Sequence, residues 1–142
     1  MPRVCLPTNN SPMLSVVIPA KNEAASIGGV VSGIKSMFPS AEIIVVDDGS
    51  TDDTGNSAES AGAVVVHHPY SKGNGAAIKS GATAASGDIV IFMDGDGQHR
   101  PEDISRLLAL MDQGYDMVVG ARTHAGQAGW HRSLANRLYN RL

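Results

Sequence analysis

The chain has 142 residues, of which 42% are hydrophobic and 18% charged, as in globular domains large enough to bury a core. Its formal net charge of -3 excludes a general nucleic-acid binder, which would be basic over the whole domain. The single cysteine, Cys5, excludes an internal disulfide, and the sequence shows neither a membrane-spanning apolar run nor a signal peptide. These features predict a soluble, cytoplasmic protein.

Apolar runs and helical patterns alternate along the chain after a polar, proline-rich start. We expect residues 1–12 to form a flexible tail and residues 13–142 to form one domain. Apolar runs predict strands over residues 14–19, 42–46, 64–67, 88–93 and 117–120. Helices are expected over residues 27–38, 51–61, 75–86 and 101–113, each followed by a proline or a glycine.

The last stretch combines apolar and basic residues at helical spacing. These residues are Trp130, Leu134 and Leu138, interleaved with Arg132, Arg137 and Arg141. The apolar seam of such a helix needs a covering surface. There are three candidates for the covering surface: the protein's own sheet, which we favour, a second copy in a homodimer, and a membrane surface.

The alternation of nearly continuous apolar strands with helices predicts an α/β fold, in which helices cover both faces of a mostly parallel sheet. Ligands of such sheets bind beyond the carboxyl ends of the strands. Three of the expected strand ends carry polar or acidic residues there, in segments 19–23, 47–50 and 94–99. We therefore expect the functional site at that edge of the sheet.

The clearest candidate site is the segment DGDGQH, residues 94–99, which directly follows an apolar run. Asp94 and Asp96 suit Mg²⁺ or Mn²⁺, which proteins bind through one or two carboxylates while water and phosphate fill the other positions. Gln98 would add a neutral oxygen ligand, and His99 is either a turn residue or the partner of a ligand. A plain acidic turn is the alternative. A helix-loop-helix calcium loop is excluded, because it requires glycine at the position of His99.

A second acidic cluster, the segment DDGSTD of residues 47–52, follows the second expected strand. Ser50 or Thr51 suits the N-cap of the next helix, and one acid would favour the dipole of that helix. This explanation does not account for two adjacent acids at the strand end. Asp47 or Asp48 would then accept a hydrogen bond from a base imide or a ribose hydroxyl.

Basic residues supply candidate phosphate contacts. Lys72 opens the segment KGNG, residues 72–75, before a helix start, where exposed amides bind anions. The segment is not a P-loop, because its lysine precedes the glycines. Arg122 and Arg132 are candidate phosphate clamps, since a guanidinium group binds phosphate through two parallel hydrogen bonds. For the other arginines of the last helix, a solvated face is the favoured explanation.

Together these segments resemble the family 2 glycosyltransferases, whose catalytic domain has the GT-A fold. The matching segments occur in the same order along nearly the whole chain: VVIPAKNE at 16–23, VVDDGSTD at 45–52, KGNGAA at 72–77, DGDGQH at 94–99 and VVGAR at 118–122. Gln98 and the basic helix after Arg122 are most similar to the polyprenyl-phosphate sugar transferases, a subgroup that includes dolichyl-phosphate mannose synthase.

The resemblance implies a Rossmann-like three-layer sandwich that transfers a hexose, with inversion, from GDP-mannose or a UDP-hexose. The acceptor that it implies is a polyprenyl (dolichyl-type) phosphate, met at the cytoplasmic face of a membrane. Nucleotide contacts are implied for Pro19, Ala20, Glu23, Asp47, Asp48, Lys72 and Asp94. The implied metal ligands are Asp94, Asp96 and Gln98, for Mg²⁺ or Mn²⁺. The implied catalytic residues are Asp96, Arg122 and Arg132, the arginines receiving the acceptor phosphate.

The resemblance also implies further chain beyond Leu142, so that these residues form an N-terminal, donor-binding portion without its acceptor half. A non-catalytic nucleotide-sugar binder is therefore the first alternative function. A sugar-1-phosphate nucleotidyltransferase is the second. It is disfavoured because no glycine-rich triphosphate loop follows the first expected strand.

Overall fold

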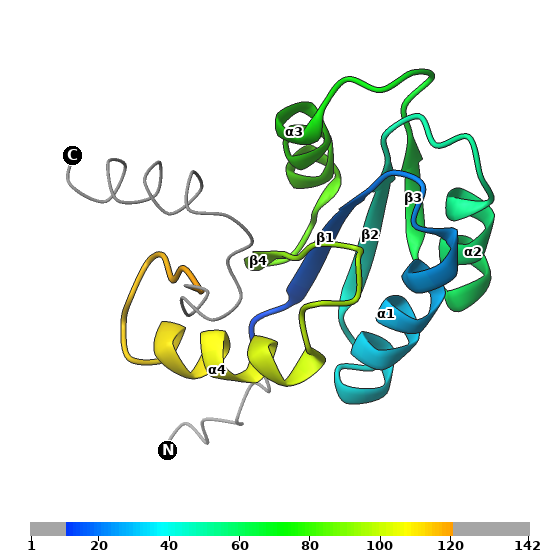
Figure 1. Cartoon of the computed structure of the whole chain (residues 1–142). Helices are drawn as coiled ribbons and strands as arrows, with labels where there is room; N and C mark the ends of the chain where they lie inside the picture. The colour runs from blue at the N-terminus through cyan, green and yellow to red at the C-terminus, as the bar shows by residue number, and fades with distance from the viewer. Residues whose placement is uncertain (1–10, 121–142) are drawn as a thin grey trace, which may run out of the picture. The chain divides into compact units, whose positions relative to one another are not determined.

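Strands and helices alternate in the computed structural model, which describes residues 11–120 (Figure 1). Their order is β1 (Leu14–Ala20), α1 (Ala24–Met37), β2 (Glu42–Asp47), α2 (Thr54–Ala61), β3 (Val64–His67), α3 (Asn74–Ala84), β4 (Ile89–Phe92) and α4 (Pro101–Met111). The chain divides into two compact units, Met1–Ile104, which holds the sheet, and Ser105–Leu142. The alternation predicted from the sequence is confirmed from β1 to α4.

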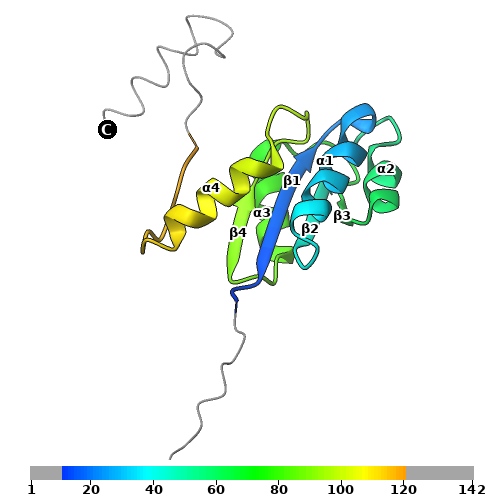
Figure 2. The same cartoon turned by 90° about the horizontal axis from the view of Figure 1, so that it is seen from below.

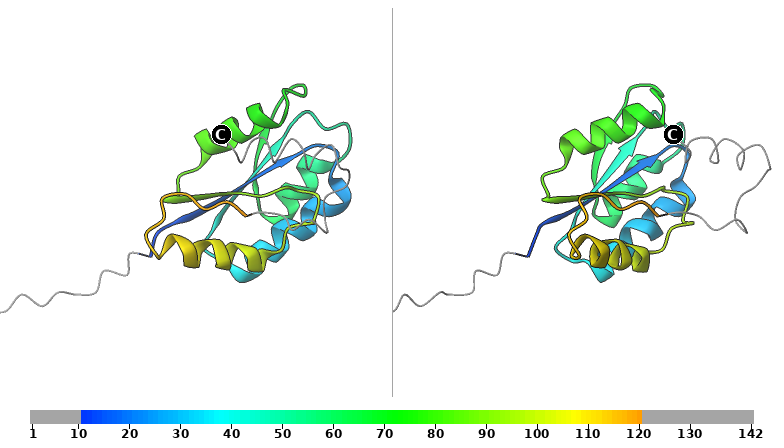
Figure 3. Two further views of the ribbon diagram at one scale, coloured as in Figure 1. Left: turned by 60° about the vertical axis from the view of Figure 1, so that its left-hand side comes forward. Right: turned by 90° about the vertical axis from the view of Figure 1, so that its left-hand side faces the viewer.

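The strands of the first unit form one parallel sheet in the order β3-β2-β1-β4 (Figure 2). Helices α1 and α2 cover one face of this sheet, and α3 covers the other (Figure 3). Strands that are covered on both faces are nearly continuously apolar, as β1 and β2 are apart from Ser15 and the end residues Glu42 and Asp47. The predicted three-layer α/β sandwich with a parallel sheet is therefore confirmed.

The core of the first unit has one layer on each face of the sheet. The layer towards α1 includes fully buried isoleucines, namely Ile18, Ile27 and Ile34. The layer towards α3 contains Val17, Ile44, Val46 and Ala77. A fully buried Val or Ile side chain contributes about 1.5–3 kcal/mol, so these two layers account for much of the stability of the sheet.

Helix α3 approaches the sheet closely, and Gly81 permits this approach. A Cβ atom at position 81 would lie 2.2 Å from Cγ1 of Val17 and 3.1 Å from Cγ2 of Val46. Carbon atoms in contact are about 3.5–4.0 Å apart, so a side chain does not fit there. The small residues of α3 thus set its distance from the sheet.

Helix α4 begins at Pro101 as predicted, with two acidic residues in its first turn, where they favour the helix dipole. Of the apolar stripe predicted for this helix, Ile104 is fully buried. The other members of the stripe are half-buried: Leu107, Leu108 and Met111. No helix among residues 11–120 is both long enough and apolar enough to span a membrane.

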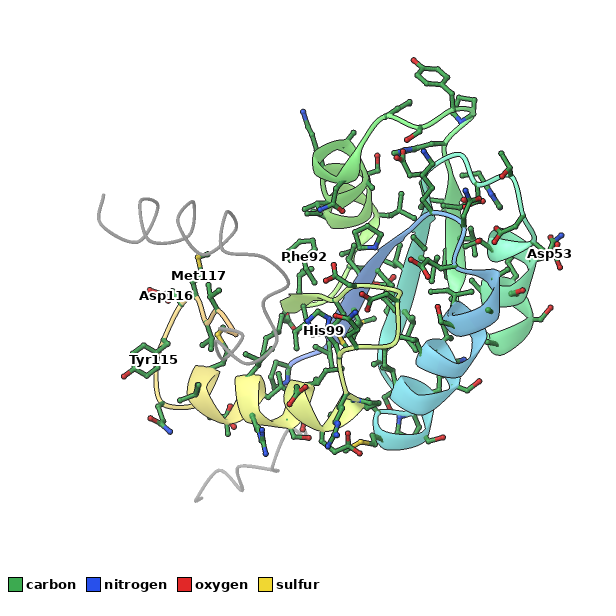
Figure 4. The ribbon with its side chains drawn as sticks, viewed as in Figure 1. Asp53, Phe92, His99, Tyr115, Asp116 and Met117 are labelled. Atoms are coloured by element: carbon green, nitrogen blue, oxygen red, sulfur yellow. The ribbon has the colours of Figure 1, made fainter. Side chains whose placement is uncertain are left out.

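The strand predicted over residues 117–120 is wrong. This segment has no regular secondary structure, and Met117 (Figure 4) and Val119 are 79% and 74% exposed. A strand forms only where a neighbouring strand pairs with its backbone groups, and no described strand pairs with this segment. An apolar run by itself does not reveal whether such a neighbour exists. Residues 1–10 of the expected tail and the helix expected over residues 130–142 lie outside the described residues.

Candidate functional site

The strand order reverses between β1 and β4, and both of these strand ends carry candidate residues. From β1 the chain moves outward through α1 to β2 and through α2 to β3. It then crosses the other face through α3 and reaches β4 on the far side of β1. Parallel α/β sheets bind ligands at such a reversal, in the crevice outside the carboxyl ends of the strands. Segments 19–23 and 94–99 border this point, as expected.

Phe92, the last residue of β4 before the acidic loop, lies on the face of the sheet that α3 covers. Contact between Val17 and Ala77 of α3 identifies that face, and Val17 is paired with Phe92. The Met93 N–H extends the pairing by donating to the Val17 carbonyl oxygen at 3.0 Å. Asp94 lies beyond the end of β4, and its carboxylate Oδ2 is 3.9 Å from Nδ1 of His99. The Asp94 side chain is 53% exposed.

Glycines shape the loop that carries the two acids. Gly95 is buried, and a Cβ atom there would lie 3.3 Å from two core isoleucine side chains, so the backbone passes directly over the core. Gly97 has a φ of +79°, in the left-handed region. Within this turn the Asp96 carboxylate accepts a hydrogen bond at 2.9 Å from the Gln98 N–H. The loop therefore leaves both Asp94 and Asp96 exposed.

The acidic pair fits a cation that is shared with phosphate. In the described part of the chain, no three His, Cys, Asp or Glu side chains are grouped as a complete metal site. A nucleotide-bound Mg²⁺ needs only one or two carboxylates, because phosphate oxygens and water provide the rest. Asp94 and Asp96 are oxygen donors of that kind and fit Mg²⁺ or Mn²⁺. Coordination by the Gln98 side chain stays a prediction.

His99 belongs to the same loop, and its Nδ1 accepts a hydrogen bond at 3.3 Å from the Asp94 N–H. This contact fits both roles expected for His99, a turn residue and the partner of a ligand, so the choice between them stays a prediction. Figure 4 shows Phe92 on β4 and His99 on the following loop, on opposite sides of the chain. His99 thus supports the loop from the side away from α3.

A hollow of about 240 Å³ lies beside the carboxyl end of β1, next to the start of α3. It is lined by Pro19, Ala20, Lys21, Asp48, Ser71, Gly73, Asn74 and Ala77. Three of the predicted nucleotide contacts therefore lie together: Pro19, Ala20 and Asp48. A second hollow of about 330 Å³ lies against α1, and none of its lining residues is acidic. The hollow beside Asp48 is the better candidate for a nucleoside.

Asp48 forms part of the wall of this hollow, and both of its carboxylate oxygens are engaged. One oxygen accepts from His68 Nδ1 at 2.7 Å and from the Lys72 N–H at 2.8 Å. The other accepts from the Ser71 hydroxyl at 2.8 Å and from the Gly73 N–H at 3.0 Å. The hydrogen bond from His68 is the main cause that holds the pKa of Asp48 well below its usual value, whereas burial acts to raise it. The ionised carboxylate thus holds the backbone of residues 71–73.

Lys72 contributes its backbone to this network and keeps its side chain exposed. Its ammonium group lies 5.6 Å from the centre of the Tyr70 ring, a cation–π distance. Gly73, with a φ of +92°, is the residue before α3, and the first N–H groups of a helix have no partner within the helix. The anion contact predicted for Lys72 stays a prediction.

Asp47, the other acid of the pair, makes different contacts. Its Oδ1 accepts from the Ser50 N–H at 3.0 Å, and its Oδ2 lies 3.3 Å from His67 Nδ1. Gly55 of α2 packs tightly here, because a Cβ atom at that position would lie 2.5 Å from the His67 ring. Asp47 thus stabilises the turn between β2 and α2. It is absent from the lining of the hollow, and its predicted nucleotide contact stays a prediction.

Hydrogen bonds join the loops that follow β1 and β2. Asn22 has a φ of +54°, a conformation that asparagine tolerates better than most residues. Its side-chain oxygen accepts from the Thr51 N–H at 2.8 Å, and its own N–H donates to Ser50 Oγ at 2.9 Å. The end of β1, which borders the hollow, is thereby fixed to the loop after β2.

Asp52 receives the first N–H groups of two helices, from Ala24 of α1 at 3.2 Å and from Thr54 of α2 at 3.1 Å. The hydrogen bond from the Thr54 side chain is the main cause that lowers the pKa of Asp52. The predicted N-cap at Ser50 or Thr51 is wrong, because α2 begins only at Thr54, and both residues instead bond to the loop after β1.

Glu23 lies close to the loop of the acidic pair. Its N–H donates to Thr54 Oγ1 at 2.9 Å, and its carboxylate accepts from Ser26 Oγ at 3.2 Å. The same hydroxyl lies 2.8 Å from the carbonyl oxygen of Gly95, and its single proton donates to one of these two acceptors at a time. The structure therefore brings Glu23 and segment 94–99 together through Ser26. The nucleoside contact expected of Glu23 stays a prediction.

Some side chains that organise the site were not predicted, namely Asn22, Ser26, His68 and Ser71. Asn22 carried a usable signal, since asparagine readily adopts a left-handed backbone between two elements. His68 and Ser71 carried none, because their contacts depend on which strand ends meet Asp48. Two predicted residues, Arg122 and Arg132, lie outside the described residues.

Comparison with known proteins identifies the family of the chain. The family model described as glycosyl transferase family 2 matches residues 15–142. The chain belongs to this family. Among its curated members, the undecaprenyl-phosphate 4-deoxy-4-formamido-L-arabinose transferase of Proteus mirabilis is 36% identical over 141 residues, covering 91% of this chain and 42% of that protein.

Solved structures of family 2 enzymes show the same fold. The crystal structure of glucosyl-3-phosphoglycerate synthase from Mycobacterium tuberculosis is 38% identical, with a TM-score of 0.63 over 71% of this chain and 41% of that one. A complex of the same enzyme with Mn²⁺, UDP-glucose and phosphoglyceric acid is equally similar, at 38% identity and a TM-score of 0.63, over 71% of this chain and 39% of that one. The predicted GT-A fold is confirmed. The chain spans less than half the length of these relatives.

Proposed function

We propose that this chain is the donor-binding portion of a metal-dependent glycosyltransferase, which moves a hexose from a nucleotide-diphosphate sugar to a phosphate-bearing acceptor. The observation that carries the proposal is the position of the loop with Asp94 and Asp96, which follows β4 at the same edge of the sheet as the hollow beside Asp48. The hollow suits the nucleoside, and the acidic pair of Asp94 and Asp96 suits the diphosphate with its cation.

The chemistry of glycosyl transfer explains why these groups belong together. Cleavage of the bond between sugar and diphosphate leaves negative charge on the nucleoside diphosphate, and a divalent ion stabilises that charge as a Lewis acid. Asp94 and Asp96 would hold the ion. The backbone N–H groups at the start of α3 and the charge of Lys72 would orient the phosphates.

The acceptor in this proposal needs positioning more than a general base. A phosphate monoester has a second pKa of about 6, so its attacking oxygen is already ionised near neutral pH. Direct attack by that oxygen inverts the anomeric centre. Arg122 and Arg132, outside the described residues, are the groups that we propose for holding the acceptor phosphate.

Relatives guide the choice of substrates. We favour a UDP-sugar over GDP-mannose, because the mycobacterial synthase of 38% identity was crystallised with UDP-glucose and Mn²⁺. We favour a polyprenyl phosphate acceptor, because the Proteus relative is named for transfer to undecaprenyl phosphate. A lipid acceptor of this kind would bring the protein to the cytoplasmic surface of a membrane.

A second candidate function is nucleotide-sugar binding without catalysis. It is favoured by the contents of the described site, since the hollow beside Asp48 and the acidic loop are both features suited to the donor. Incubation with a radiolabelled UDP-hexose and undecaprenyl phosphate separates the two. Label in the lipid phase indicates transfer, whereas donor binding without labelled lipid indicates the second function.

Thermal unfolding with and without Mn²⁺ tests donor binding directly, using UDP, GDP, UDP-glucose and GDP-mannose. A ligand at one hundred times its dissociation constant stabilises the folded state by about 2.7 kcal/mol. We expect the preferred nucleotide to raise the midpoint temperature of unfolding, and to raise it further when Mn²⁺ is present. In the Asp96→Asn variant, Mn²⁺ should add nothing to the effect of the nucleotide. Asp53→Asn is the matched control, because Asp53 is an exposed aspartate at the start of α2 that lines neither hollow (Figure 4). An undiminished effect of Mn²⁺ on the Asp96→Asn variant would place the cation elsewhere.

A further inference from the structure

His68 is a buried histidine that the proposed reaction does not use directly. It directly follows β3, is 7% exposed, and has a hydrogen-bonding partner at each ring nitrogen. Its Nδ1 donates to Asp48 at 2.7 Å, and its Nε2 lies 2.9 Å from Ser80 Oγ of α3. Its backbone N–H also donates to the Asp47 carbonyl oxygen at 2.9 Å. One residue therefore connects the end of β2, the end of β3 and helix α3.

The contacts of Asp48 leave its carboxylate little capacity for a ligand. An ionised carboxylate offers about four acceptor positions, and the donors His68, Ser71, Lys72 and Gly73 occupy that number. A base imide would have to displace one of these donors in order to bond to Asp48. The contacts that the carboxylate does make all hold residues 71–73 or the His68 ring.

The held segment forms one wall of the hollow. Ser71 and Gly73 line it, and so does Asn74, the first residue of α3. The orientation of the Asp48 carboxylate thus sets where this wall and the start of α3 lie. His68 orients the Asp48 carboxylate through Nδ1, because its ring is itself held in place by the hydrogen bond between Nε2 and Ser80 Oγ.

We propose that His68 is a positioning residue of the donor site: it orients the Asp48 carboxylate, which in turn holds residues 71–73 in the conformation that receives the nucleoside. This inference rests on the proposed function, because it assigns the nucleoside to the hollow. It gives Asp48 the role of holding the wall of the hollow. Both protonation states of the imidazole fit, because the Ser80 hydroxyl can either donate to Nε2 or accept from it.

The test separates the nucleoside part of the site from the diphosphate part. The full chain is titrated calorimetrically with UMP and with GMP in the absence of metal, and separately with inorganic pyrophosphate in the presence of Mn²⁺. We expect His68→Ala to weaken binding of the preferred mononucleotide about tenfold or more, the change typical for loss of a charge-assisted hydrogen bond that orders a site. Binding of pyrophosphate with Mn²⁺ should weaken less than binding of the mononucleotide, because the acidic pair that would hold the cation does not depend on His68, and it reports that the variant is folded.

Two further variants distinguish positioning from packing. His68→Asn retains an amide N–H near the place of Nδ1 and should restore most of the mononucleotide affinity. His67→Ala is the matched control, because His67 is the adjacent histidine, has a side chain that is 54% exposed, and contacts Asp47 instead of Asp48. This control should bind both probes like the wild type.

The outcomes are distinct. Mononucleotide affinity that is unchanged in folded His68→Ala, or that is not restored by His68→Asn, overturns the inference while the proposed function stands. Wild-type protein that binds neither probe overturns the proposed function itself. If His68→Ala does not fold, Ser80→Ala takes its place: it frees only Nε2, so we expect a smaller loss of mononucleotide affinity, and no loss overturns the inference.

Discussion

Replacing Asp48 by asparagine should destabilise the fold, because it preserves the shape of the side chain and changes one acceptor oxygen into a donor. If the new NH₂ group faces His68 and Lys72, the neutral imidazole can accept at Nδ1, but the Lys72 N–H meets another donor. If it faces the other way, the Ser71 hydroxyl can turn to accept, but the Gly73 N–H meets a donor. Either orientation leaves one backbone N–H without an acceptor.

The magnitude follows from this accounting. A backbone N–H left unsatisfied costs about 1–3 kcal/mol, and the remaining hydrogen bonds lose the assistance of a full charge. We expect Asp48→Asn to lower the free energy of unfolding by about 2–4 kcal/mol at pH 7. With a typical urea m-value of about 2 kcal/mol per molar, the unfolding midpoint falls by about 1 M or more at unchanged m.

The pH dependence gives the same experiment a second readout. The pKa of Asp48 is lower in the folded protein than in the unfolded chain, where it is about 3.9. The stabilisation that the Asp48 carboxylate provides is therefore complete above this unfolded-state pKa. It is lost as the pH falls from that value towards the folded-state pKa. The difference in stability between wild type and Asp48→Asn should therefore be constant from about pH 7 to pH 5 and narrow below about pH 4.

The control for this experiment is Asp53→Asn. Asp53 is exposed at the start of α2 (Figure 4), and its carboxylate accepts from the Asn56 side chain at 2.7 Å. This substitution should change the free energy of unfolding by no more than about 0.5 kcal/mol. If Asp48→Asn were as stable as this control at pH 7, the hydrogen-bond accounting around Asp48 would be refuted.

Three further predictions concern the core, the loops and the reaction. Gly81→Ala should lower the free energy of unfolding in urea by about 1–3 kcal/mol, because the added Cβ would lie 2.2 Å from Val17. Gly29→Ala is the control: a Cβ at position 29 has nothing within 4 Å, so this substitution should raise the free energy of unfolding by up to about 1 kcal/mol. Equal effects of the two substitutions would contradict the close packing of α3. Asn22→Ala should lower the free energy of unfolding by about 1–2 kcal/mol in the same assay. The substitution removes the side-chain oxygen that accepts from the Thr51 N–H, and it places alanine at a φ of +54°, which alanine tolerates less well than asparagine. An unchanged free energy of unfolding would show that other contacts join the two loops. In NMR spectra of the transfer product, the anomeric configuration should be opposite to that of the donor, and retention would rule out direct attack by the acceptor phosphate.

The sequence predicts where the site lies along the chain, because parallel strands bring their carboxyl ends to one edge of the sheet whatever their order. Segments 19–23 and 94–99 could be assigned to that edge for this reason. Their closeness in space depends on β1 and β4 being neighbours, which only the topology reveals.

The sequence does not distinguish Asp47 from Asp48. The two are adjacent and chemically identical, yet one bonds towards His67 and α2 and the other towards His68, α3 and the hollow. Strand alternation and the register between β2 and β3 decide this difference. The same dependence on pairing explains why residues 117–120, apolar like the true strands, were wrongly predicted to be one.

The central claim is that a divalent ion on the acidic pair binds the diphosphate of a sugar donor. The most direct measurement is an anomalous-difference map from crystals of this chain soaked with Mn²⁺ and UDP. We expect a peak within coordination distance of a carboxylate oxygen of Asp94 or Asp96, about 2.0–2.2 Å, with the uridine in the hollow beside Pro19 and Asp48. A manganese peak bonded to other residues, with UDP outside that hollow, would contradict the claim.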